Sequence, residues 1–150
     1  MKSLKISGKA KFKENSHAIW EALHSEKVLM YAIPGCQSFT LNDEGEYDIN
    51  LKLGIAVIKG EYIGKACVED VEEPTQFRLM ALGCGKQGVV DMQINFIIEP
   101  LRDGCQVIWE CDAKLGGMIA KVGNRVMGVI VKFLAENLFK GLQKQLHARV

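Results

Sequence analysis

The stretch from Gly116 to His147 constrains the fold of this chain more than any other. No proline interrupts it, and its apolar residues recur at steps of three and four: Met118, Ile119, Val122, Val126, Val129, Ile130 and Phe133. This period is typical of an amphipathic helix whose apolar stripe faces a core. At a rise of about 1.5 Å per residue the helix would be about 45 Å long, more than twice the usual length. We therefore expect one long carboxyl-terminal helix that lies across most of the protein.

The residues before this helix read as strands and short helices. Residues 2–13 alternate between apolar and polar side chains, which is typical of a strand with one buried face. Asn15 or Ser16 can cap a first short helix, and Ser25 can cap a second that stops before Pro34. Six further strands are predicted between short turns, over residues 39–41, 47–53, 55–71, 77–81, 90–98 and 107–115, with a break at Gly83-Cys84-Gly85.

This order predicts an α+β fold in which a curved antiparallel sheet carries the long helix on its apolar face. The length of 150 residues is the usual size of one domain, so residues 1–150 are expected to form a single one. Lys plus Arg (19) nearly balances Asp plus Glu (18), which gives no support for nucleic-acid binding. We expect neither a transmembrane span nor a secretory signal, because no apolar run reaches about 18 residues and the chain opens directly into a strand.

The five cysteines indicate a reduced, cytoplasmic protein. They form no Cys-x-x-Cys pair and no cluster with histidine: Cys36, Cys67, Cys84, Cys105 and Cys111. We therefore expect no metal site, and no motif in the sequence calls for a cofactor.

Glycines at inward positions of the strands suggest a cavity between sheet and helix. Gly8, Gly60 and Gly64 stand where the alternation calls for inward side chains, and glycines inside strands mark bends or close approaches. They could simply let helix and sheet approach closely, or they could leave an apolar space under the helix. The predicted lining of that space is Leu51, Ile58, Gly60, Tyr62, Gly64, Leu79, Met92, Ile94, Trp109, Val122, Val126, Met127 and Ile130. Such a lining suits an isoprenoid, acyl or aromatic ligand, held by burial of apolar area.

No catalytic residues are predicted, although two residues are candidates for an enzyme. Tyr62 is the best candidate acid because it points inward, and Cys36 could be a reactive thiol near the mouth of the cavity. The carboxylates of Asp91 and Asp112 fall on the solvent side of their strands. The histidines are expected on the surface or in the tail: His17, His24 and His147. No histidine, cysteine and carboxylate form a readable nucleophile–base arrangement.

Several short motifs, in this order of elements, resemble one family. They are Ser7-Gly8, Trp20-x-x-Leu23, Ile33-Pro34-Gly35-Cys36, Lys59-Gly60, Gly117-x₅-Gly123-x-Arg125 and Phe139. Together they resemble the family of the carbon monoxide dehydrogenase G subunit, within the START-like helix-grip superfamily that includes the birch pollen allergen and the polyketide cyclases. The resemblance implies a seven-stranded curved antiparallel sheet, wrapped around the long helix, with two short helices after the first strand.

The resemblance also implies a function. It suggests an accessory protein beside a molybdenum hydroxylase, acting in maturation, membrane recruitment or carriage of a lipophile such as a quinone. Our leading hypothesis is a carrier of a hydrophobic, lipid-like small molecule. A polyketide cyclase- or dehydratase-like enzyme, and an interaction protein with an empty pocket, remain alternatives.

The second half of the long helix poses a separate problem. Five four-residue steps turn the helix by about 200°, so one straight helix cannot bury this whole row against one sheet: Val126, Ile130, Leu134, Leu138, Leu142 and Leu146. The helix must bend near Gly128 or Gly141, or pack its second half elsewhere. The short helices, a second copy in a homodimer, a partner enzyme or a membrane surface could receive it. We expect Phe139 and Leu142 to dock or gate there, and glutamate at Leu142 and Leu146 to weaken association without unfolding the protein.

Overall fold

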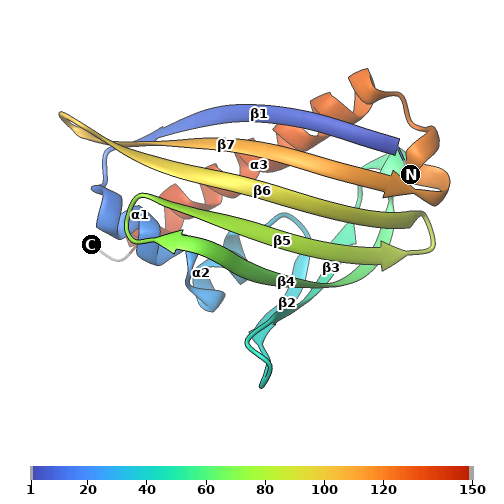
Figure 1. The fold of residues 1–150 in the computed structure, drawn as a ribbon, viewed down its shortest axis with the longest axis horizontal. Coiled ribbons are helices and arrows are strands. Elements are labelled where there is room, and N and C mark those ends of the chain that lie inside the picture. The colour runs from blue at the N-terminus through green and yellow to red at the C-terminus, as the bar shows by residue number, and fades with distance from the viewer. Residues whose placement is uncertain (1, 149–150) are drawn as a thin grey trace.

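A computed structural model describes residues 2–148 and contains a seven-stranded antiparallel sheet in the order β1-β7-β6-β5-β4-β3-β2. The long helix α3 crosses one face of this sheet, and the short helices α1 and α2 lie near the carboxyl-terminal end of α3 (Figure 1). This confirms the predicted α+β fold with the long carboxyl-terminal helix. The strands are β1 (Lys2–Phe12), β2 (Cys36–Leu41), β3 (Tyr47–Leu53), β4 (Gly60–Glu72), β5 (Gln76–Gly85), β6 (Gly88–Leu101) and β7 (Gly104–Gly116).

The two short helices begin where their caps were predicted. In α1 (Ser16–Leu23) the side chain of Asn15 accepts a hydrogen bond from the backbone N–H of Ala18, at 2.9 Å. In α2 (Glu26–Ala32) the hydroxyl of Ser25 accepts one from Val28. These bonds satisfy backbone donors that the first turn of a helix otherwise leaves unpaired.

Two predicted strand boundaries are wrong. Residues 56–58 form a short 3₁₀ helix, η1 (Ala56–Ile58), and β4 begins only at Gly60. Gly60, where the chain re-enters the sheet after this turn, has a φ of +149°, a conformation that favours glycine. The predicted break at residues 83–85 does not occur, because β5 continues through Gly85 in register with β4 and β6.

The long helix begins later than predicted. Residues 117–121 form a 3₁₀ turn, η2 (Gly117–Lys121), and α3 spans Asn124–Ala148. Gly117 has a φ of +77° and packs on the backbone of Gly88, the first residue of β6. The Ile119 N–H donates to the Gln87 carbonyl at 2.9 Å. These tertiary contacts hold the segment out of the helix despite its helical period.

The buried side of α3 differs from the stripe read in the sequence. Ile119 and Ile130 are buried as predicted, and Met127 joins them. Val122 packs against the core. The other large apolar residues of that stripe are about half-exposed or more, and they are Met118, Val126, Val129 and Phe133. The row that faces the protein runs through Met127, Val131, Leu134, Leu138 and Leu142. Its first and last members are buried, as are Ile130 and Phe139 at its sides, and the middle three are partly buried. Residues in this row are three or four positions apart, which on average is close to one helical turn of about 3.6 residues. Both halves of α3 can therefore turn the same side towards the rest of the protein.

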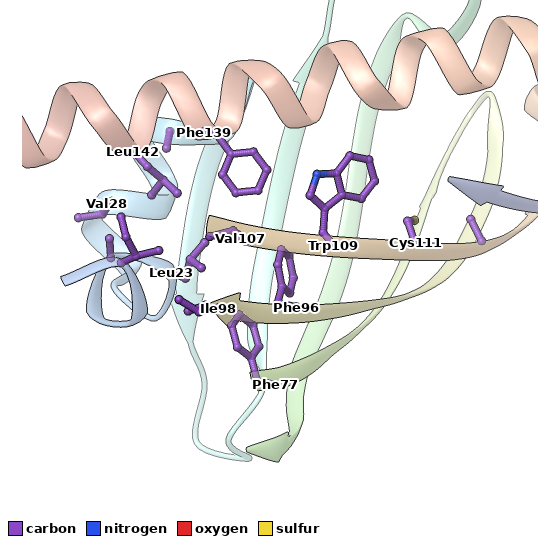
Figure 2. Close-up of a cluster of buried hydrophobic side chains, with 14 of the residues drawn as sticks. Leu23, Val28, Phe77, Phe96, Ile98, Val107, Trp109, Cys111, Phe139 and Leu142 are labelled. Atoms are coloured by element: carbon purple, nitrogen blue, oxygen red, sulfur yellow. The ribbon is translucent and has the colours of Figure 1, made fainter. Parts of the chain in front are cut away.

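The second half of α3 packs on the short helix α2 and on β1. Leu142 is fully buried at 0% exposure, and Figure 2 shows it beside Val28 of α2. A Cβ on Gly141 would lie 2.8 Å from Ala32 Cα, so helix and helix touch backbone to backbone there. The ring of Phe139 meets that of Phe12 at 5.9 Å, edge to face. Of the sites proposed for this half, the short helix α2 receives it, and Leu142 is a core residue, contrary to the prediction that it docks a partner.

Truncation of Leu142 is expected to destabilise the whole fold. Leu142→Ala should lower the free energy of unfolding by about 2–5 kcal/mol, because it leaves a cavity in a closely packed site. The control Val129→Ala, at a position 68% exposed on the same helix, should change it by less than about 0.5 kcal/mol. Urea denaturation measures both values. Equal effects of the two substitutions would contradict this packing.

Candidate ligand-binding cavity

A cavity of about 370 Å³ lies between the sheet and α3. Residues from all seven strands, from α3 and from the short helices line it. Figure 2 shows side chains in this region, with Trp109 and Phe96 rising from the strands towards α3 and Phe139 descending from the helix. The volume is that of a small-molecule pocket, for which about 300–1,000 Å³ is usual.

Most of the predicted lining residues do line this cavity. They are Leu51, Ile58, Tyr62, Gly64, Leu79, Met92, Ile94, Trp109, Met127 and Ile130. Three others lie outside its lining. Val126 is half-exposed on the outer side of α3, Val122 precedes that helix in an extended conformation, and Gly60 opens β4 beside the side chain of Gln87.

The sequence reading missed the contribution of the second half of α3. Leu134, Ala135, Leu138 and Phe139 all face the cavity. Their spacing of three and four residues continues the row from Met127 and Val131, so the signal was present in the sequence. A row counted from Val126 instead of Met127 turns the second half to the wrong side of the helix, so the predicted lining does not include these residues.

Polar groups in the lining are few, and the one buried hydroxyl among them is already paired. Tyr62 is 8% exposed and its hydroxyl donates a hydrogen bond of 2.6 Å to the carbonyl of Ile58. Burial raises the pKa of this phenol, so it remains protonated at neutral pH. Lys65 also borders the cavity, but its side chain is 58% exposed and its ammonium lies 4.0 Å from Glu46. The interior therefore offers a ligand almost only apolar contact.

The thiols near the cavity are poor nucleophiles. Burial, assisted by the neighbouring Asp112 carboxylate, raises the pKa of Cys111 to about 11, so this lining residue is a neutral thiol. Burial also raises the pKa of Cys36, whose thiol lies 3.4 Å from the carbonyl of Ser38. Cys36 lies outside the cavity lining. Its position therefore lends no support to a reactive thiol at the cavity.

The other candidates for chemistry lie away from the cavity lining. Asp112 is half-exposed and faces Lys5 at 4.0 Å, as the parity of its strand predicted. His24 was expected to be a surface residue, but its ring stacks on that of Trp20 at a centroid distance of 4.3 Å and meets that of Phe77 at 4.4 Å. His147 lies 3.4 Å from Glu14.

Across residues 2–148, no group of three or more histidine, cysteine or acidic side chains is placed to hold a metal ion. Within the same residues, no helix is long and apolar enough to cross a bilayer.

Solved structures share this architecture. A conserved protein from Geobacillus kaustophilus is 29% identical and superposes with a TM-score of 0.86, over 97% of this chain and 95% of that one. A START superfamily protein from Mycobacterium smegmatis is 10% identical, with a TM-score of 0.75 over 97% and 99% of the two chains. The di-domain ARO/CYC StfQ from the steffimycin biosynthetic pathway is 8% identical, with a TM-score of 0.72; the match covers 99% of this chain and 52% of StfQ.

The last two likenesses establish the START-like fold alone, since their identities are so low. No curated protein sequence matches the chain. The family of the carbon monoxide dehydrogenase G subunit (CoxG) matches residues 8–147, which is nearly the whole length. The chain therefore belongs to the CoxG family.

Proposed function

We propose that this protein binds a hydrophobic small molecule, such as an isoprenoid, a quinone or another lipid-like compound, in the cavity under α3. The observation that carries the proposal is a cavity of about 370 Å³ whose lining is almost wholly apolar. At about 30 Å³ per molecule this is room for about twelve waters, yet the walls offer few hydrogen-bonding partners to hold them. Apolar ligands need no such partners.

Burial of apolar area is the main source of affinity in such a site. Each buried methylene contributes about 0.8 kcal/mol, so a chain of about ten gains about 8 kcal/mol, of which association consumes at least about 4 kcal/mol. The remainder, about 4 kcal/mol, corresponds to a Kd of about 1 mM, and every further gain of about 1.4 kcal/mol tightens binding tenfold. The lining contains few fixed polar groups that could select one head group from within, so the cavity favours a class of ligand defined by shape and apolarity.

Family membership supports an accessory or carrier role beside a molybdenum hydroxylase. The name of the family refers to one subunit of a carbon monoxide dehydrogenase. An apolar cavity whose buried hydroxyl is engaged by the backbone suits a molecule that is held rather than transformed. In this proposal the protein holds a lipophile for the enzyme or delivers it.

An enzyme of the cyclase or dehydratase kind is the second candidate. It is favoured by the fold shared with StfQ and by the phenol of Tyr62 in the cavity wall. The hydrogen bond from that phenol to Ile58 weighs against it, because a group engaged with the backbone is not free to protonate a substrate.

A substitution that fills the cavity should weaken binding strongly. Met92→Trp places an indole in the space, and we expect at least a tenfold weaker Kd for quinones and fatty acyl compounds. The matched control is Ile63→Trp on β4, where the side chain is 66% exposed, and it should bind as the wild type does. Fluorescence titration gives the Kd values, and circular dichroism verifies that both variants fold.

Organic extraction of the purified protein, followed by mass spectrometry, should yield a lipophile at near-stoichiometric amounts. If extraction yields none and neither quinones nor fatty acids shift the thermal transition, the carrier hypothesis fails and an interaction protein with an empty pocket is the better account.

Removal of the Tyr62 hydroxyl separates the carrier from the enzyme. Tyr62→Phe should lower stability by about 1–3 kcal/mol, because the buried Ile58 carbonyl loses its donor, and it should leave the Kd for an apolar ligand unchanged. Thermal denaturation and titration measure the two effects. Turnover of an aromatic polyketide by the wild type that disappears in this variant would instead establish the enzyme.

A further inference from the structure

A second pocket, of about 320 Å³, lies on the opposite side of the cavity wall. It is a groove between β1 and the middle of α3, and we call it the β1–α3 groove. Four lysines line it, Lys9 and Lys11 from the strand and Lys132 and Lys140 from the helix, against one carboxylate, Glu136. Among the described residues no ion pair engages these four ammonium groups. The groove therefore carries an excess of positive charge that attracts anions.

The groove and the cavity share part of one wall. Trp109, Ala135 and Phe139 line both spaces, so a single layer of side chains separates them. One member of this layer is an alanine, the smallest of the three side chains. The shared wall is thus a boundary of one layer of side chains between the apolar interior and the lysines outside.

The indole of Trp109 supplies an unengaged donor at this wall. Its ring lies over Gly8, where a Cβ would come within 2.6 Å of the ring and within 2.9 Å of its nitrogen. Figure 2 shows the indole nitrogen on the side of the ring that faces Phe139. Among the hydrogen bonds of the described residues, none uses this N–H. The indole nitrogen is not among the buried, unpaired polar atoms of the described residues, so it is accessible, and an acceptor on a ligand at the wall would pair with its N–H.

The cavity itself cannot hold a charged head group. The hydroxyl of Tyr62 is bound to Ile58, and burying an unpaired carboxylate or phosphate among apolar side chains is strongly unfavourable. An amphiphile in the cavity must therefore leave its head outside. Lys65 at the border of the cavity is paired with Glu46 at 4.0 Å. The β1–α3 groove is a neighbouring pocket whose lysines have no such partner among the described residues.

We propose that the ligand is an anionic amphiphile, with its apolar chain in the cavity and its carboxylate or phosphate head in the β1–α3 groove. The chain crosses the wall beside Ala135, the Trp109 N–H donates to the head group, and the lysines neutralise its charge. This inference rests on the proposed function, since it requires that the cavity holds an apolar chain, and it names the class of that ligand.

A matched pair of ligands tests the inference. Dodecanoate and its methyl ester have the same chain, and only the first carries a charge. Wild-type protein should bind dodecanoate about five- to tenfold more tightly at low salt, and the preference should shrink as ionic strength rises. Dodecyl phosphate should behave like dodecanoate. Acetate and inorganic phosphate at the same concentration should displace neither dodecanoate nor dodecyl phosphate, because these small anions have no apolar chain to bury in the cavity.

Substitution of the lysines locates the head group. Lys132→Gln combined with Lys140→Gln should reduce the preference to less than twofold and leave the Kd of the methyl ester unchanged. The control combines Lys121→Gln with Lys144→Gln, which removes the same charge at exposed positions outside the groove and should retain the preference.

The outcomes separate this inference from the proposed function. Equal binding of acid and ester by the wild type, a preference that survives Lys132→Gln with Lys140→Gln, or displacement by inorganic phosphate alone would each overturn the head-group assignment, and the carrier function would stand. Failure of every chain-bearing ligand to bind would overturn both.

Discussion

The helix α3 approaches its neighbours closely at two glycines, and these contacts help to set where it lies over the sheet. At Gly141 a Cβ would lie 2.8 Å from Ala32 Cα, and at Gly128 one would lie 3.0 Å from the side chain of Ile6. These contacts hold the helix against α2 near its end and against β1 near its start. Between and beside them the sheet curves away, and the space left over is the cavity. Gly8 serves β1 in the same way, because it makes room for the Trp109 ring that divides the cavity from the β1–α3 groove.

The chemistry of the cavity follows from which polar groups the fold has already used. The phenol of Tyr62 is engaged by a backbone carbonyl, and burial keeps the thiol of Cys111 protonated. An apolar interior of this kind selects ligands by burial of area and leaves recognition of a head group to the surface. The lysines of the β1–α3 groove, separated from the interior by one layer of side chains, are placed for that recognition.

The sequence predicted the order of elements well because local signals agree with tertiary structure over most of the chain. Alternation in β1 and the caps at Asn15 and Ser25 are of this kind. The prediction failed where distant contacts decide the backbone. Gly117 and Ile119 carry a helical period, yet their contacts with Gly88 and Gln87 hold them in a 3₁₀ turn.

Most of the cavity lining on the strands was predictable, because successive side chains of a strand point to opposite faces of the sheet. It was less predictable from the helix, because two apolar rows run along α3 and periodicity does not say which one faces the sheet. Val126, Val129 and Phe133 form the row that remains exposed, and Met127, Leu134 and Leu138 the row that faces the cavity. Neither the second groove nor its shared wall has a sequence signal, since both depend on how β1 and α3 are placed in space.

Methyl NMR can show whether an apolar chain occupies the space between Met92 and Leu138. With dodecanoate bound to methyl-labelled protein, we expect nuclear Overhauser effects from the ligand chain to the methyl groups of Met92, Ile94, Leu134 and Leu138. Contacts confined to the exposed Val126 and Val129, or no contacts at saturating ligand, would contradict this placement of the chain.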